Sequence, residues 1–253
     1  MKGSTKVGKK HRLYYVTGSK GGVGKSLVAT SLIFFLLENK KDVRVIDTDD
    51  SNPDVGRIYE NSLRVSYIPL SDNTKSWGLF LNALEEFSSS NGDAGEIHVV
   101  VNGAARDNKT IEHNGDLLNS VFQEGLDYDF STLWVISDSI DSVNLLNSYI
   151  SVVLTGNLFV FRNLHFGEPS DFITFNQAIP NLKGRVNGIY EFPNLDSTVS
   201  SLIHREKLLL SEVSKKVSIG WRMLYLRWLN DVRRNFHSMN EYLTKLEENN
   251  YAD

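Results

Sequence analysis

The chain has 253 residues and a formal net charge of −4 at pH 7, with 41% apolar and 23% charged residues. This balance is that of a globular protein with a sizeable core, and it excludes disordered, collagen-like and low-complexity classes. The absence of cysteine excludes disulfides, a cysteine nucleophile and thiolate-held metals. The most apolar run, Leu27 to Leu37, is about half as long as a membrane-spanning helix, so we expect a cytoplasmic protein without stable membrane insertion.

Short β-branched or aromatic runs alternate along the chain with longer helical patterns. Strands are predicted at residues 13–17, 43–47, 65–69, 97–101, 133–137, 158–161 and 186–192. Helices are predicted at residues 26–38, 77–87 and 141–154 and from 197 almost to the end, with loops at 88–95 and 106–115. This order predicts an α/β fold whose mainly parallel, twisted sheet carries helices on both faces.

We expect one domain, residues 13–253, in which residues 197–253 form a helical C-terminal part. Residues 1–12 precede it as a basic segment that need not be ordered. No period of 20–50 residues repeats, which sets repeat architectures aside.

Residues 18–26, GSKGGVGKS, fit the G-x-x-x-x-G-K-[ST] pattern of a phosphate-binding loop, and they follow a predicted strand and precede a predicted helix. Glycines let backbone N–H groups turn toward phosphate oxygens, and the helix that follows points its positive end at them. Lys25 is expected to contact the β- and γ-phosphates and the Ser26 hydroxyl to bind Mg²⁺. The alternative is a glycine-rich turn that binds nothing, which the strand–loop–helix context disfavours. The sequence therefore predicts ATP and Mg²⁺ as cofactors, held by Gly21, Gly22, Val23, Gly24, Lys25, Ser26 and Leu27.

Two carboxylates, Asp47 and Asp49, stand at the end of the second predicted strand. That strand comes one strand–helix–strand step after the loop, so its carboxyl end should lie beside the phosphates. The alternative for Asp49 is a turn cap before Pro53.

The inner lysine, Lys20, completes the motif KGGVGKS, and in this the chain resembles the ParA/MinD class of P-loop ATPases with a deviant Walker A motif. The resemblance implies an ATP-dependent homodimer in which Lys20 reaches the nucleotide of the partner subunit. It also implies that Asp49 positions the attacking water and that Asp47 supports either the Mg²⁺ shell or the loop lysine. A solvated lysine on the loop is the alternative for Lys20.

The resemblance weakens at the next strand, where the family carries an aspartate and this chain has Val101 and Asn102. An amide adds no charge to a magnesium site, so we expect hydrolysis to be slow and stimulated by a partner. The family also implies that Asn163 contacts adenine and that the loop at Pro193 packs over the base. Capping of a turn is the alternative for Asn163.

The segments VVVNGAA and FRNLHFGEP and the pair Arg233-Arg234 resemble the TraL/StbB-type ATPases of conjugative and mobilisable plasmids. This implies a role in plasmid partition, stability or transfer with a partner protein. Two other functions remain open: a nucleotide-binding scaffold with little or no hydrolysis, and a metabolic ATP-dependent ligase on the same fold.

The last predicted helix carries apolar residues at helical spacing that should dock on the domain, namely Trp221, Leu224, Tyr225, Trp228, Leu229, Val232 and Phe236. Arg222, Arg227, Arg233 and Arg234 are opposed in this stretch only by Asp231. They are interpreted either as a strip for non-specific DNA or as a solvated face paired with acidic neighbours.

Overall fold

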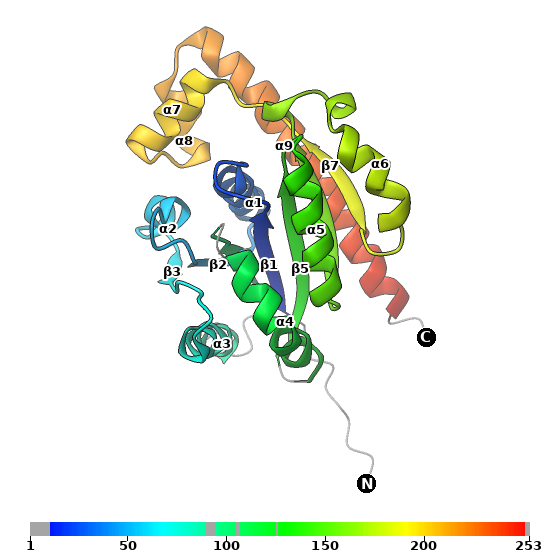
Figure 1. Cartoon of the computed structure of the whole chain (residues 1–253). Helices are drawn as coiled ribbons and strands as arrows, with labels where there is room; N and C mark the ends of the chain where they lie inside the picture. The colour runs from blue at the N-terminus through cyan, green and yellow to red at the C-terminus, as the bar shows by residue number, and fades with distance from the viewer. Residues whose placement is uncertain (1–10, 90–94, 105–106, 125, 251–253) are drawn as a thin grey trace.

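A computed structural model describes residues 11–89, 95–104, 107–124 and 126–250 (Figure 1). Seven strands form one sheet in the order β3-β2-β4-β1-β5-β6-β7, and every neighbouring pair is parallel. The strands are β1 (His11–Gly18), β2 (Asp42–Asp47), β3 (Arg64–Tyr67), β4 (Ile97–Asn102), β5 (Tyr128–Ile136), β6 (Asn157–Asn163) and β7 (Gly188–Phe192). The predicted parallel α/β fold is confirmed.

Nine α-helices and two 3₁₀ turns are described in these ranges. They are α1 (Lys25–Glu38), α2 (Asp54–Tyr59), α3 (Thr74–Ser89), α4 (Asp107–Glu124), α5 (Ile140–Val152), η1 (Leu164–Phe166), η2 (Pro169–Asp171), α6 (Ile173–Leu182), α7 (Ser197–Glu206), α8 (Leu210–Lys216) and α9 (Ile219–Asn250). No helix among the described residues is both long enough and apolar enough to cross a membrane.

Two apolar layers enclose the sheet because successive side chains of each strand point to opposite faces. On β1, Tyr14 and Val16 join the layer that packs under α1, α2 and α7 to α9. Leu13 and Tyr15 join the layer that packs under α3 to α6. Burial on both faces explains why the strands read as continuous apolar runs.

The phosphate loop leaves the centre of the sheet. β1 lies between β4 and β5; β6 and β7 follow beyond β5 on one side, and β2 and β3 lie beyond β4 on the other. Parallel sheets of this kind bind ligands at the carboxyl ends of the strands where the order reverses. The loop after β1 occupies that position.

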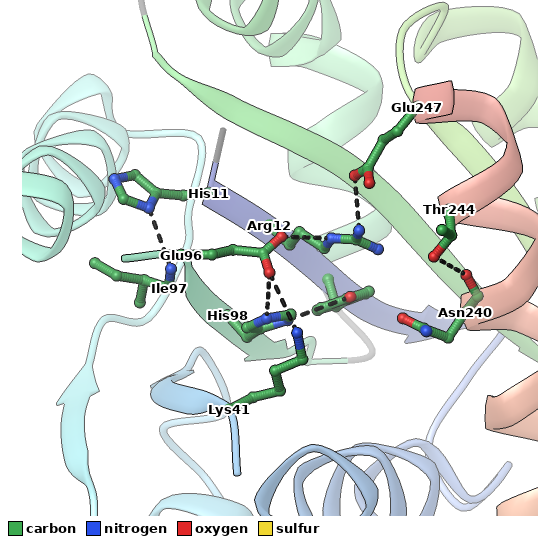
Figure 2. A network of polar contacts seen from close by, with 10 residues as sticks. His11, Arg12, Lys41, Glu96, Ile97, His98, Asn240, Thr244 and Glu247 are labelled. Carbon is green, nitrogen blue, oxygen red and sulfur yellow. Dashed lines mark hydrogen bonds and ion pairs between the residues drawn. The ribbon is translucent and has the colours of Figure 1, made fainter. Parts of the chain in front are cut away.

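A polar network ties the long last helix to the opposite, amino-terminal end of the sheet (Figure 2). The buried Arg12 of β1 donates from Nε to Oε1 of Glu96 and from an Nη to Oε1 of Glu247 on α9, each at 2.7 Å. Glu96 also accepts from His98 Nε2 at 3.1 Å and Lys41 Nζ at 3.5 Å. The network therefore joins β1, the start of β4 and the end of α9.

The boundaries of α4 and β1 differ from the sequence predictions. Residues 107–115, predicted as a loop, belong to α4, whose backbone departs from helical angles only at Asn114. Gly115, the last residue of that predicted loop, packs closely instead: a Cβ there would lie 2.0 Å from Cγ1 of Val152 on α5. β1 begins two residues early, at His11, so Arg12 belongs to the sheet, and residues 1–10 lie outside the described ranges.

The helical C-terminal part is confirmed from Ser197 onward, with one error on its docking face. Tyr225, Trp228, Leu229, Val232 and Phe236 are buried as predicted, whereas Leu224 is 54% exposed. It lines a hollow beside Pro193 and Leu195 instead of packing into the core.

Candidate functional site

The phosphate loop is held by a contact to α5, by a hydrogen bond within the loop and by the backbone conformation of Gly24. Ser19 is buried and shares a 2.7 Å hydrogen bond with Ser142 of α5. The Nζ of Lys25 donates to the carbonyl oxygen of Lys20 at 2.8 Å, and this lysine is only 8% exposed. Gly24 precedes α1 with φ +98°, a conformation that favours glycine. The loop is thus built to present the first N–H groups of α1 and a buried lysine to an anion.

A cleft of about 420 Å³ opens in front of this loop. Its walls include Gly21, Gly22, Gly24, Lys25, Ser26 and Leu27 from the predicted set, and Asp49 and Asn163 from other elements. Burial lowers the pKa of Lys25, and the charges of Asp49 and Asp107 act against this. The structure therefore brings most of the predicted residues to one hollow.

Two predicted loop residues do not line the cleft. Val23 is 1% exposed and packs in the core beneath α1, where its backbone carbonyl rather than its side chain serves the site. The side chain of Lys20 is exposed, and its backbone carbonyl holds Lys25.

Asp47 and Asn102 form a buried pair at the ends of β2 and β4. The amide Nδ2 of Asn102 donates to Oδ1 of Asp47 at 3.0 Å, and the Gly56 N–H donates to Oδ2 at 2.8 Å. Burial raises the pKa of Asp47 despite these hydrogen bonds. An aspartate at position 102 would face Asp47 as a like charge, so the neutral amide suits this partner.

Asp49 serves a turn and also faces the cleft. Its Oδ1 accepts from the N–H groups of Ser51 at 3.1 Å and Asn52 at 3.0 Å, which is the capping arrangement considered as the alternative. The same residue lines the cleft and acts on Lys25. The turn holds the carboxylate at the cleft wall, so the two interpretations do not compete.

Sequence reasoning missed Asp107, which was placed in a loop. Its Oδ2 accepts from Thr48 Oγ1 at 2.5 Å, the Ala104 N–H at 2.9 Å and Tyr15 OH at 3.1 Å. These contacts fix the segment after β4 against β2 behind the phosphate loop. A signal was present: an aspartate at the start of α4, five residues beyond the end of an apolar strand.

Asn163 lines the cleft and also caps a turn, whereas Pro193 does not line the cleft. The Nδ2 of Asn163 donates to the Val23 carbonyl at 2.8 Å, and its Oδ1 accepts from the His165 N–H at 3.0 Å, capping η1. Pro193 lies outside the walls of the cleft, and its carbonyl accepts from Trp228 Nε1 at 2.9 Å. Its neighbours Asn194 and Leu195 line the cleft instead.

The far wall of the cleft comes from α7 and was not predicted. Ser197, Ser200, Ser201 and His204 line it, and His204 Nδ1 lies 3.9 Å from Oδ2 of Asp54 on α2. Serines and a histidine on one helix face are typical of a solvent-exposed helix, so the sequence alone does not assign them to the site.

The residues present fit a magnesium ion bound together with phosphates. The described residues contain no cluster of three or more His, Asp or Glu side chains that would hold a metal alone. Mg²⁺ in phosphate sites usually keeps several waters and takes few protein ligands, and Ser26 lies on the cleft wall. Oδ1 of Asn102 is buried and has no hydrogen-bond partner in the described part of the chain, so it is free to accept from a water.

Comparison with known proteins agrees with this geometry. The sequence profile of the CobQ/CobB/MinD/ParA nucleotide binding domain matches residues 14–251. Protein MobD from Acidithiobacillus ferrooxidans is 34% identical over 224 residues, which cover 88% of this chain and 95% of MobD.

Solved structures share the fold at low sequence identity. MinD from Aquifex aeolicus is 15% identical with a TM-score of 0.53, covering 90% of this chain and 97% of that one. McdA from Cyanothece, without nucleotide, is 15% identical with a TM-score of 0.51, covering 89% and 99%. Both agree with this chain in overall fold.

Proposed function

Because the chain belongs to the CobQ/CobB/MinD/ParA family of nucleotide-binding domains, we propose that it binds Mg-ATP and works as an ATP-dependent dimer switch. The observation that carries this is the buried Lys25, held by its own loop at the mouth of a cleft that Ser26 and Asp49 also line. Members of the ParA/MinD family are in general ATPases. A charged lysine that is only 8% exposed is costly unless an anion completes the site.

Each residue of the site has a role in this proposal. Lys25 and the loop N–H groups bind the phosphates, and Ser26 holds Mg²⁺, which neutralises charge on the phosphate oxygens when bound. Asp49 orients the water that attacks, and the exposed Lys20 is free to reach a second subunit.

Slow turnover follows from Asn102. It replaces a carboxylate with an amide already committed to Asp47, so the site has less negative charge to organise the metal and its waters. A scaffold that binds nucleotide without turnover is the second candidate, and the same observation favours it. Nothing in the cleft favours a metabolic ligase.

The process served by the switch is inferred from the relatives. The name MobD points to mobilisation, so we place this chain in plasmid transfer or partition, acting on a partner protein. This agrees in kind with the resemblance to TraL/StbB-type ATPases. DNA binding through the C-terminal arginines stays a prediction. Arg233 pairs with Glu38 and Arg234 with Asp231, which favours the alternative of a solvated face paired with acidic neighbours.

The test of nucleotide binding compares two lysines of one loop. Lys25→Ala is expected to weaken binding of a fluorescent ATP analogue with Mg²⁺ by roughly 10- to 100-fold or more, because it removes charge-assisted hydrogen bonds to phosphate. Lys20→Ala is expected to bind as the parent does, since its side chain lies outside the cleft. The exposed Lys75→Ala controls for loss of one positive charge. Parental affinity in Lys25→Ala would remove the loop from the nucleotide site.

A further inference from the structure

The beginning of α9 carries an unusual density of exposed apolar side chains. Ten large apolar residues in the described part of the chain are exposed, and four of them lie between residues 219 and 226. This part of α9 lies beside α7 and α8, beyond the carboxyl ends of the strands (orange in Figure 1). A cluster of this kind marks an interaction surface more often than scattered single residues do.

Three of these residues form one line along the helix, which we call the outer stripe: Ile219, Met223 and Leu226. They are 72%, 62% and 37% exposed. Their spacing of four and then three residues is that of the apolar seam between two packed helices. The opposite face of the same helix, with Tyr225, Trp228 and Leu229, packs on the domain. The outer stripe is therefore an unpartnered second face, unneeded for docking α9.

Arginines flank this stripe on both sides. Helical geometry places Arg222 on one side of the stripe and Arg227 on the other. Neither arginine forms an ion pair within the described part of the chain, and Nε of Arg222 is shielded from solvent without an acceptor there. The surrounding residues 197–234 contain eight Lys and Arg against three Asp and Glu, on a chain whose net charge is −4.

The charge of the two arginines discriminates between possible binding partners of the outer stripe. In a seam of two helices, the positions beside the stripe face each other, so a second copy would set Arg222 and Arg227 against arginines. The first ten residues of the chain, with Lys2, Lys6, Lys9 and Lys10, are basic as well and equally ill-suited. An apolar stripe of three side chains is also small for a membrane anchor, whose strength grows with buried apolar area.

We propose that the outer stripe, with Arg222 and Arg227, is the docking site for an acidic amphipathic helix of a partner protein. Apolar residues of that helix cover Ile219, Met223 and Leu226, and its flanking carboxylates pair with the two arginines. The surface is separate from the nucleotide cleft, so the docking site stands whether or not the switch hydrolyses ATP.

The test uses a synthetic three-heptad peptide with Ile and Leu in the seam and Glu beside it, and binding is measured by calorimetry with the full chain. The parent is expected to bind the peptide. The variants Met223→Ser and Arg222→Glu/Arg227→Glu are each expected to bind it at least about tenfold more weakly. The matched peptide with Lys in place of Glu should bind Arg222→Glu/Arg227→Glu better than the parent. Leu79→Ser and Lys75→Glu on α3 are the controls, since they alter an exposed apolar residue and an exposed lysine elsewhere.

Four results contradict the proposal. The first is parental binding in both stripe variants, and the second is no binding by the parent. The third is binding of random duplex DNA or anionic vesicles, without peptide binding, that the same variants lose. The last is a concentration-dependent dimer of the nucleotide-free chain that Met223→Ser abolishes. Thermal melting and ATP binding of each variant show that the fold is intact.

Discussion

Asn102 shows how one neutral residue can be matched to its surroundings at a site where a carboxylate is expected. Its amide donates to Asp47, a carboxylate buried to 1% exposure and already receiving N–H groups from Gly56 and Asp49. A buried carboxylate needs such donors, and a second carboxylate would supply none. Asn102 in place of a carboxylate also leaves the metal site with less negative charge. The need of Asp47 for a hydrogen-bond donor is thereby linked to the proposed slow turnover.

Asn102→Asp is therefore expected to destabilise the fold rather than restore a fast enzyme. Two facing carboxylates raise the pKa of the pair above the ordinary carboxyl value. The loss of folding stability therefore grows as pH rises through that raised pKa. We expect a loss of about 2 kcal/mol at pH 8 and less at pH 5, measured by urea unfolding. Asn61→Asp makes the same change at an exposed position and controls for charge alone. Equal stability of Asn102→Asp and parent at pH 8 contradicts the pairing.

Gly24 offers a second prediction at this scale. A Cβ at this position would lie 2.4 Å from Nδ2 of Asn163, and φ is +98°. Gly24→Ala is expected to displace Asn163, to cost about 1–3 kcal/mol of stability and to weaken ADP binding. Gly78→Ala on α3 is the control, because no atom lies within 4 Å of its Cβ, its φ is not positive and it lies away from the cleft. Similar unfolding and ADP titration curves for the two variants would contradict this account of the loop.

At the scale of elements, the strands and the phosphate loop were predictable and α4 was not. Apolar strands buried on both faces leave a plain signal, and GSKGGVGKS carries its own chemistry. The first half of α4 was predicted as a loop that ends at Gly115, whereas the missing Cβ of this glycine makes room for Val152. Close packing between α4 and α5 depends on residues far apart in the sequence. The spacing of apolar residues along one segment does not predict such a contact.

The link between α9 and the sheet predicts a pH dependence (Figure 2). Burial alone raises the pKa of Glu96, but hydrogen bonds and charges from His98 and Arg12 outweigh it and lower the pKa to about 2. A depressed carboxyl pKa stabilises the fold above its ordinary value of 4.5, and this contribution is lost as pH falls from 4.5 toward 2.

Glu96→Gln is accordingly expected to be about 2 kcal/mol less stable than the parent at pH 7. The difference should shrink between pH 4.5 and pH 3, as the parent loses the same contribution. Urea unfolding at pH 7, 4.5 and 3 measures this, with the exposed Glu85→Gln as control. A difference that stays constant with pH would show that Glu96 acts through packing alone.

At the scale of the whole molecule, one half of the cleft was predictable from the sequence and the other half was not. The residues of the first half belong to the phosphate loop itself or, like Asp49, follow the next strand along the chain. The other half comes from α7, more than 170 residues after Lys25, and from Asn194 and Leu195 after β7. Only the return of the chain over the sheet brings these residues to the phosphates. Pro193 was chosen for the base contact, and the fold presents its neighbours instead.

The central claim is that ATP converts this chain from monomer to dimer, and light scattering of the 28.6 kDa protein on a sizing column tests it most directly. The account predicts a monomer with ADP, twice that mass with Mg²⁺ and a non-hydrolysable ATP analogue, and a lasting dimer of Asp49→Ala with ATP. Lys20→Ala should bind the analogue and remain a monomer. A parent that binds the analogue and keeps the same mass as with ADP contradicts the switch and leaves a monomeric nucleotide-binding scaffold.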